Sequence, residues 1–186
     1  MVRFTPFLFA CLLGSSAAGL TPSLKRSDQQ VSKDGTLRCG NFGSASKHTS
    51  PNLLKDLQRG GRIATKVWTI KGGQCNRVHC YDTSGVYVCN DHKKDMTIAG
   101  HMIAKGLKCI TDNCCRDDWD SRDNYQKGQS GQKFYRGMES NFNIVLAYGH
   151  CGHDANVKPH DEGGWDVNPV CMGGVLTPDV DGCSAM

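Results

Sequence analysis

The chain has 186 residues, is 38% hydrophobic and carries a formal net charge of +4 at pH 7. Its most apolar run, residues 4–13, is about ten residues long, well short of the roughly 20 that a membrane-spanning helix needs. These values exclude membrane insertion and favour one domain with a modest hydrophobic core.

The N-terminus reads as a targeting segment. Arg3 precedes the apolar run and small residues occupy positions 14–18, the order of a secretory signal peptide (residues 1–18) cut after Ala18. Lys25 and Arg26 resemble the dibasic sites of kexin-type proteases in the fungal secretory pathway, with an ordinary exposed charged pair as the alternative. Residues 19–26 are therefore expected to be a short pro-segment outside the fold.

Ten cysteines remain once Cys11 leaves with the signal. An even, high number in a short secreted chain predicts a disulfide framework of up to five bridges, and spacing alone leaves the pairing open. The adjacent Cys114 and Cys115 are expected to join two separate partners. The predicted disulfide cysteines are Cys39, Cys75, Cys80, Cys89, Cys109, Cys114, Cys115, Cys151, Cys171 and Cys183.

The first elements have clear boundaries. Residues 27–38 are polar and without period, which predicts a flexible arm, and order should begin near Cys39. A short helix is then expected, with Ser50 as N-cap, Pro51 in its first turn and a stop at residues 60–61. Residues 66–70 predict a short strand.

A hairpin and a helix follow. Residues 77–81 and 86–90 are β-branched and aromatic, and the Asp-Thr-Ser-Gly run between them is suited to a loop. Asp95 is a candidate N-cap for a helix over residues 96–110, whose apolar positions recur at helical spacing. Gly100 and Gly106 weaken that helix by up to about 1 kcal/mol each.

A second hairpin is expected from residues 132–136 and 141–148, with a turn at 137–140. The order helix, hairpin, helix, hairpin predicts an α+β sandwich over residues 39–151, in which an antiparallel sheet from two hairpins packs against two helices. Residues 152–186 lack a period and predict an irregular tail tethered by Cys171 and Cys183.

Charge is distributed unevenly. Residues 38–111 carry 12 Lys or Arg and 4 acidic residues, whereas residues 112–186 carry 6 and 12. Such asymmetry either marks a basic face for an anionic partner or neutralises itself between the halves of one compact domain.

The hairpin "GGQCNRVHCYDTSGVYVCND", the following helix with a late cysteine, and "GQKFY" with "NFNIVLAYGHC" resemble small secreted cysteine-rich proteins of filamentous fungi. These are similar in outline to killer-toxin-like and necrosis-inducing effectors. The resemblance covers residues 39–151 and implies an α/β sandwich without a cofactor, in some members acting as a virulence effector. It transfers no catalytic residue to this chain.

The run "YGHCGHDANVKPH" is the strongest candidate for chemistry. His150, His153, Asp154 and His160 include metal-ligand types, but export favours a cystine at Cys151 over a thiolate, so a solvated loop is expected in place of a metal site. The enzymatic alternative is a secreted ribonuclease-type hydrolase, in which Glu139 with His150 or His153 moves the proton and Arg136 contacts the phosphate.

The sequence thus predicts an extracellular, monomeric effector that binds a host protein or host surface component, outside host cells or after transfer into them. Neither nucleic acid nor a cofactor is expected. A ribonuclease and a cell-wall or carbohydrate-binding protein remain the alternatives.

Overall fold

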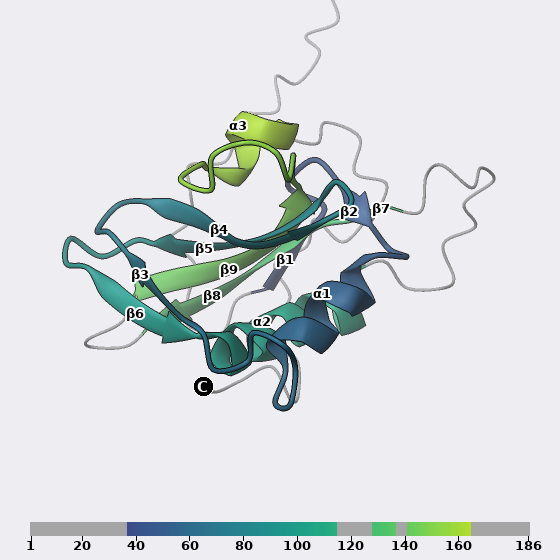
Figure 1. Ribbon diagram of the computed structural model, residues 1–186. Coiled ribbons are helices and arrows are strands. Elements are labelled where there is room, and N and C mark those ends of the chain that lie inside the picture. The colour runs from purple at the N-terminus through teal and green to yellow at the C-terminus, as the bar shows by residue number, and fades with distance from the viewer. Residues whose placement is uncertain (1–36, 115–127, 137–140, 165–186) are drawn as a thin grey trace, which may run out of the picture. The chain divides into compact units, whose positions relative to one another are not determined.

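The computed structural model describes residues 37–114, 128–136 and 141–164, all within one compact unit formed by residues 32–186. Five antiparallel strands form the main sheet in the order β1-β8-β9-β5-β4 (Figure 1). The long central strands β5 and β9 therefore come from different hairpins, which joins the two hairpins into one sheet. The strands are β1 (Leu37–Cys39), β4 (Cys75–Tyr81), β5 (Ser84–Asn90), β8 (Gly131–Arg136) and β9 (Asn141–Tyr148).

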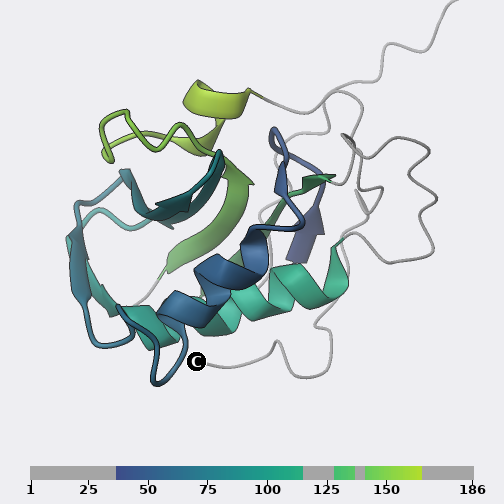
Figure 2. The same ribbon diagram turned by 45° about the vertical axis from the view of Figure 1, so that its right-hand side comes forward.

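Helices lie on both faces of the sheet. Helices α1 (Ser50–Leu57) and α2 (Gly100–Asn113) lie side by side on one face, and the short helix α3 (Pro159–Gly163) lies on the other (Figures 1 and 2). The central strands are consequently covered twice, and all seven residues of β5 are buried.

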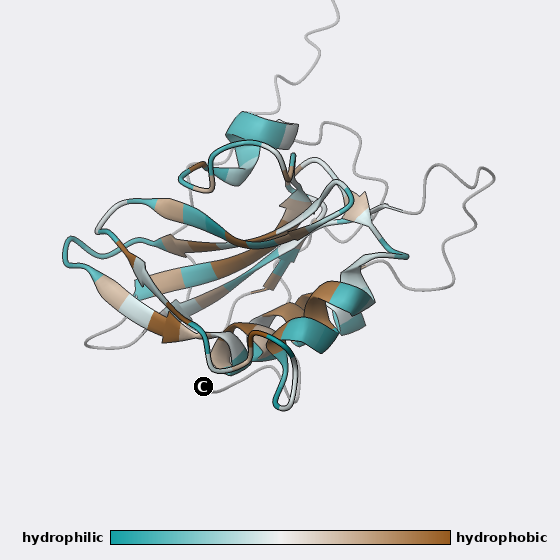
Figure 3. Ribbon diagram, viewed as in Figure 1, coloured by the Kyte–Doolittle hydropathy of each residue, from teal (hydrophilic) through white to brown (hydrophobic). Residues whose placement is uncertain are grey.

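Alternation along β9 explains how one strand serves two cores. Phe142, Ile144 and Leu146 belong to the core under α1 and α2, whereas Val145 and Ala147 pack with Phe42 and Tyr87 on the opposite face. Because successive side chains of a strand point to opposite faces, a continuous apolar run is what a doubly covered strand requires. The apolar residues accordingly gather between the sheet and the helices (Figure 3).

Two short ribbons flank the sheet: β2 (Ala45–Ser46) pairs with β7 (Gly128–Gln129), and β3 (Val67–Ile70) pairs with β6 (Met96–Ala99). The second pairing corrects the helix predicted from residue 96, which begins only at Gly100. Residues 96–99 instead form a strand because their β-branched Thr97 and Ile98 have a partner in β3. A Cβ on Gly100 would lie 2.2 Å from the carbonyl oxygen of Ile63, so glycine allows α2 to begin against that backbone.

Other boundaries also differ from the sequence expectation. The sheet includes β1 from Leu37, inside the segment expected to be a flexible arm, because Leu37 is fully buried and pairs with Lys133. Residues 152–164 were expected to be irregular but include α3, where a proline in the first turn favours helix. The N-cap of α1 is Thr49, one residue before the predicted Ser50.

The coarse prediction of mixed helix and antiparallel strand is confirmed, as is disulfide bonding. The bridges among the described residues are Cys39–Cys114, Cys75–Cys89 and Cys80–Cys151, and Cys109 is also disulfide-bonded. Cys115, Cys171 and Cys183 lie outside the described residues. No helix in the described ranges is long and apolar enough to cross a membrane.

Candidate functional site

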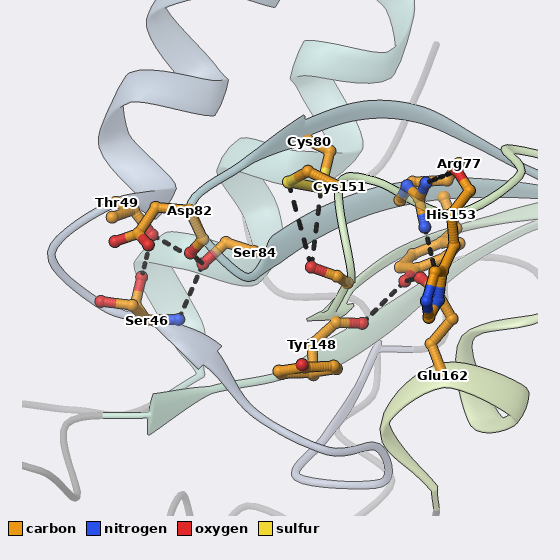
Figure 4. The surroundings of a disulfide bond; sticks show 12 residues. Ser46, Thr49, Arg77, Cys80, Asp82, Ser84, Tyr148, Cys151, His153 and Glu162 are labelled. Atoms are coloured by element: carbon orange, nitrogen blue, oxygen red, sulfur yellow. Dashed lines mark hydrogen bonds and ion pairs between the residues drawn. A yellow bond between two sulfur atoms is a disulfide. The ribbon is translucent and has the colours of Figure 1, made fainter.

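The histidine-rich run leaves the end of β9 and folds back over the sheet. The amide of His153 donates to the carbonyl of His150 at 3.0 Å, and the two imidazole rings stack with their centroids 3.8 Å apart. Both residues are exposed. Between them, Cys151 is bonded to Cys80 on β4, which leaves no thiolate for a metal (Figure 4).

Two of the residues proposed for a ribonuclease can be placed by their backbone, and they lie at opposite ends of β9. Arg136 pairs with Asn141 at the start of β9, whereas His150 follows the end of that strand. An eight-residue strand is about 26 Å long, so the register separates the Arg136 backbone from the histidines. Glu139 and the side chain of Arg136 lie outside the described part of the chain.

A different set of polar groups meets beneath the histidines. Arg77 of β4 donates from Nη1 to the carboxylate of Glu162 in α3, and from Nη2 to the carbonyl of His153 at 2.6 Å (Figure 4). The Tyr87 hydroxyl donates to the other oxygen of Glu162 and lies 2.7 Å from the carbonyl oxygen of Tyr148. We call Arg77, Tyr87 and Glu162 the buried triad.

The electrostatics of the buried triad favour its charged form. Burial alone would raise the pKa of Glu162, but the hydrogen bonds from Arg77 and Tyr87, with the charge of Arg77, hold it below the ordinary value. The pKa of Arg77 is raised, because the contacts with Glu162 outweigh burial. Burial, followed by the adjacent Glu162 carboxylate, raises the pKa of the Tyr87 hydroxyl.

Glycines make room for this arrangement. A Cβ on Gly85 would lie 2.7 Å from the Tyr87 ring, and one on Gly149 would lie 2.9 Å from its hydroxyl oxygen. The ring therefore lies over bare backbone, with its hydroxyl directed at Glu162. His153 approaches the same carboxylate from the solvent side, with its Nδ1 3.6 Å away.

The chemical role open to the triad follows from its burial. The side chains of Arg77 and Glu162 are only 3% and 2% exposed, and their charged ends are used by each other and by the backbone. Groups that are both enclosed and fully bonded hold a fold together and offer little to a substrate. The triad and the Cys80–Cys151 bridge together fasten residues 149–164 to the sheet.

The turn between β4 and β5 adds a third attachment. Asp82 and Thr83 have φ values of 42° and 57°, which fits the two-residue turns of twisted hairpins and shortens the predicted four-residue loop. A β-branched residue in this conformation is uncommon. The carbonyl of Thr83 accepts the amide of Gly149 at 3.0 Å, so the turn also binds the start of the histidine-rich run.

The same hairpin is joined to α1 through hydroxyl groups. The Ser84 hydroxyl accepts the amide of Ser46 at 2.9 Å and lies 2.6 Å from the Thr49 hydroxyl (Figure 4). Ser84 is fully buried, so these bonds satisfy a polar group that would otherwise be costly to enclose.

One further pair of titratable groups lies at the other side of β4. His79 Nε2 is 3.0 Å from the Asp56 carboxylate, which also accepts from Arg62 at 2.8 Å. Burial lowers the pKa of His79 despite this partner, so the imidazole is neutral near pH 7. The hydrogen bond from Arg62 is the main reason that the pKa of Asp56 is lowered.

The "CND" motif at the end of β5 is structural. Cys89 is bridged to Cys75, Asn90 donates to the carbonyls of Ile70 and Lys94, and Asp91 accepts from Asn143. The motif therefore fixes the β3–β6 ribbon to the sheet.

Sequence reasoning did not single out the triad. Arg77 and Glu162 are 85 positions apart, and a charged residue in a strand or after a proline ordinarily indicates exposure.

No cluster of three or more metal-ligand side chains occurs among the described residues. No protein-family model, curated protein or solved structure matches this chain.

Proposed function

We propose that the chain is an exported virulence effector of a filamentous fungus, which acts by binding a protein or surface component of its host. The resemblance of the cysteine-bearing segments, the signal-like N-terminus and the bridged fold support this proposal. Crosslinks and buried polar networks protect a small domain from proteases and leave its surface for binding.

The buried triad is the observation that carries the preference for binding over catalysis. The Glu162 carboxylate beside His153 is enclosed, and it is bonded by the Arg77 guanidinium and the Tyr87 phenol. General acid–base catalysis needs such groups within reach of a substrate proton. Their use as a fastening supports a scaffold that presents a surface.

Gene deletion in the producing fungus tests the proposal. We expect the deletion strain to colonise its host poorly while growing normally in culture, and the wild-type gene to restore colonisation. Equal damage to growth and colonisation would count against an effector.

The ribonuclease alternative is tested on the purified, oxidised protein. We expect no hydrolysis of RNA by the wild type. Hydrolysis that disappears in Glu139→Ala and His150→Ala would replace the binding proposal. Retention on chitin or cellulose would favour the cell-wall alternative.

A further inference from the structure

The chain contains two pairs of adjacent basic residues, Lys25 with Arg26 and Lys93 with Lys94. The first pair resembles the dibasic sites of kexin-type proteases. The second pair lies in the connection between β5 and β6, where both lysines are exposed. Exposed connections between secondary-structure elements are the usual places of proteolytic cleavage. Sequence and exposure alone would therefore make the second pair a site for the same protease.

The side chain of Asn90 closes this connection. Its Nδ2 donates to the carbonyl of Lys94 at 2.8 Å and to the carbonyl of Ile70, the last residue of β3, at 3.0 Å. Its Oδ1 accepts the amide of His92 at 3.0 Å. Asn90 itself is 1% exposed. One buried amide group therefore binds the backbone of the connection at two points and joins it to the end of β3.

The connection between β3 and β4 packs against the same backbone. The amide of Gly73 donates to the carbonyl of His92 at 3.0 Å, and the amide of Gly72 donates to the carboxylate of Asp95 at 3.1 Å. A Cβ on Gly72 would lie 2.3 Å from the carbonyl oxygen of Lys93, so glycine at this position allows the two connections to touch. Bonded backbone thus flanks the lysine pair on both sides.

A cut after the lysine pair would use the carbonyl that Asn90 holds. Endoproteases bind a substrate in extended form through its backbone, and they direct the oxygen of the attacked carbonyl into an oxyanion hole. In the fold, the Lys94 carbonyl accepts from Asn90, and the backbone of residues 92–94 is bent. The connection must therefore open locally before a protease can act on it.

We propose that Lys93 and Lys94 form a conditional cleavage site, open to dibasic-specific endoproteases in the unfolded chain and closed by Asn90 in the folded one. This inference goes beyond host binding, because it concerns the maturation of the exported chain. Cleavage adds one water across the Lys94–Asp95 peptide bond and leaves a carboxylate on Lys94 and an amino group on Asp95. A chain that folds before it meets the protease keeps its domain whole, whereas an unfolded chain is cut within it.

The disulfides give this cut a distinctive product. The bridges Cys39–Cys114 and Cys80–Cys151 each join a residue before position 94 to a residue after it. The two pieces of a cut, oxidised protein would therefore stay linked and separate only on reduction. Electrophoresis with and without a reductant distinguishes this product from the whole domain.

The test is digestion of the oxidised protein, with residues 19–26 still attached, by a purified kexin-type protease. We expect cleavage after Arg26 and a domain that stays whole on a reducing gel. The same protein, reduced, alkylated and unfolded, should be cut after Arg26 and after Lys94. This comparison uses the wild-type chain and needs no variant to fold.

The variant Asn90→Ala tests the closing residue. In the folded, oxidised state it should be cut after Lys94 about tenfold faster than the wild type, because it loses the hydrogen bonds that oppose local opening, and the open population sets the rate. The control Asn52→Ala removes an exposed asparagine from α1 and should resist as the wild type does. Glu162→Gln weakens the buried triad and leaves the contacts of Asn90 in place, so it should also resist.

Three results would overturn the proposal. Cleavage of the folded wild type after Lys94 as fast as after Arg26 would show that the connection is not closed. Resistance of the unfolded chain at Lys94 would show that the pair is not a site for the protease. Equal cleavage of Glu162→Gln and Asn90→Ala would show that global unfolding, and not the contacts of Asn90, controls access.

Discussion

Arg77 and Glu162 are 85 positions apart in the chain and form an ion pair whose side chains are 3% and 2% exposed. The pair joins the edge strand β4 to α3, and it does so beneath the exposed histidines that make the sequence look catalytic. A charge pair enclosed in this way is costly to break, because the remaining partner keeps its charge in a poorly solvated place.

Glu162→Gln should therefore lower the free energy of unfolding by about 3–5 kcal/mol, the usual cost of breaking a buried ion pair. The neighbouring Asp161→Asn, at an exposed position, should change it by less than about 0.5 kcal/mol. Denaturant unfolding with intact disulfides measures both. The double variant Arg77→Met/Glu162→Leu removes both charges and should recover much of the loss; a double variant less stable than Glu162→Gln would contradict this account.

Acid should destabilise the protein through two kinds of group. The pKa values of Glu162 and Asp56 are lowered in the folded state, so their contribution is present above about pH 4.3 and is lost as the pH falls below it. The pKa of His79 is also lowered. As the pH falls, the unfolded chain therefore binds a proton at His79 that the folded chain does not bind. The protein loses stability from about pH 6.5 downward for this reason.

Urea unfolding between pH 8 and pH 4 measures this dependence. Stability should decline in two stages on acidification, and His79→Gln should remove part of the stage that starts near pH 6.5 while leaving the stage near pH 4 in place. A wild-type stability that rises on acidification between pH 7 and pH 5 would show that the sign is wrong.

The sequence predicts those elements whose signal is local. The β4–β5 hairpin is recognisable because both strands and their turn lie within residues 75–90, and α1 because its start and stop residues are adjacent to it. Strand β6 is different, because its partner β3 lies far earlier in the chain: Trp68 pairs with Ile98, 30 positions later. Its residues alone continue the helical spacing of α2, and only the pairing makes them a strand.

The buried triad was unpredictable for a related reason. Composition and periodicity assign Arg77 and Glu162 to the surface, and burial of both depends on a contact that neither segment encodes by itself.

The expectation that Cys151 is oxidised could be reached from the sequence, because it follows from the redox compartment and needs no knowledge of the partner.

The stability lost on removing a disulfide should increase with the length of the loop that the disulfide closes. The Cys80–Cys151 bridge spans 71 positions and Cys75–Cys89 spans 14, and in the chain-entropy model the longer loop contributes about 1.4 kcal/mol more. Unfolding of the paired Cys→Ser variants measures the difference.

Hydrogen exchange should also increase over residues 149–164 when Cys80–Cys151 is removed. Unchanged exchange there would show that the triad alone holds the segment.

The variant Gly100→Ala tests whether helix propensity or the close contact with Ile63 decides the stability of the first turn of α2. Propensity alone predicts that alanine stabilises a helix relative to glycine by up to about 1 kcal/mol. In the fold, the added Cβ would lie 2.2 Å from the carbonyl oxygen of Ile63, a backbone atom that cannot rotate away. We therefore expect destabilisation of about 1–3 kcal/mol, the usual cost of overpacking. Lys105→Ala, on the exposed face of α2, controls for propensity and should change stability by less than about 0.5 kcal/mol. A more stable Gly100→Ala protein would mean that α2 does not start against Ile63, and that residues 96–99 continue the helix as the sequence pattern suggests.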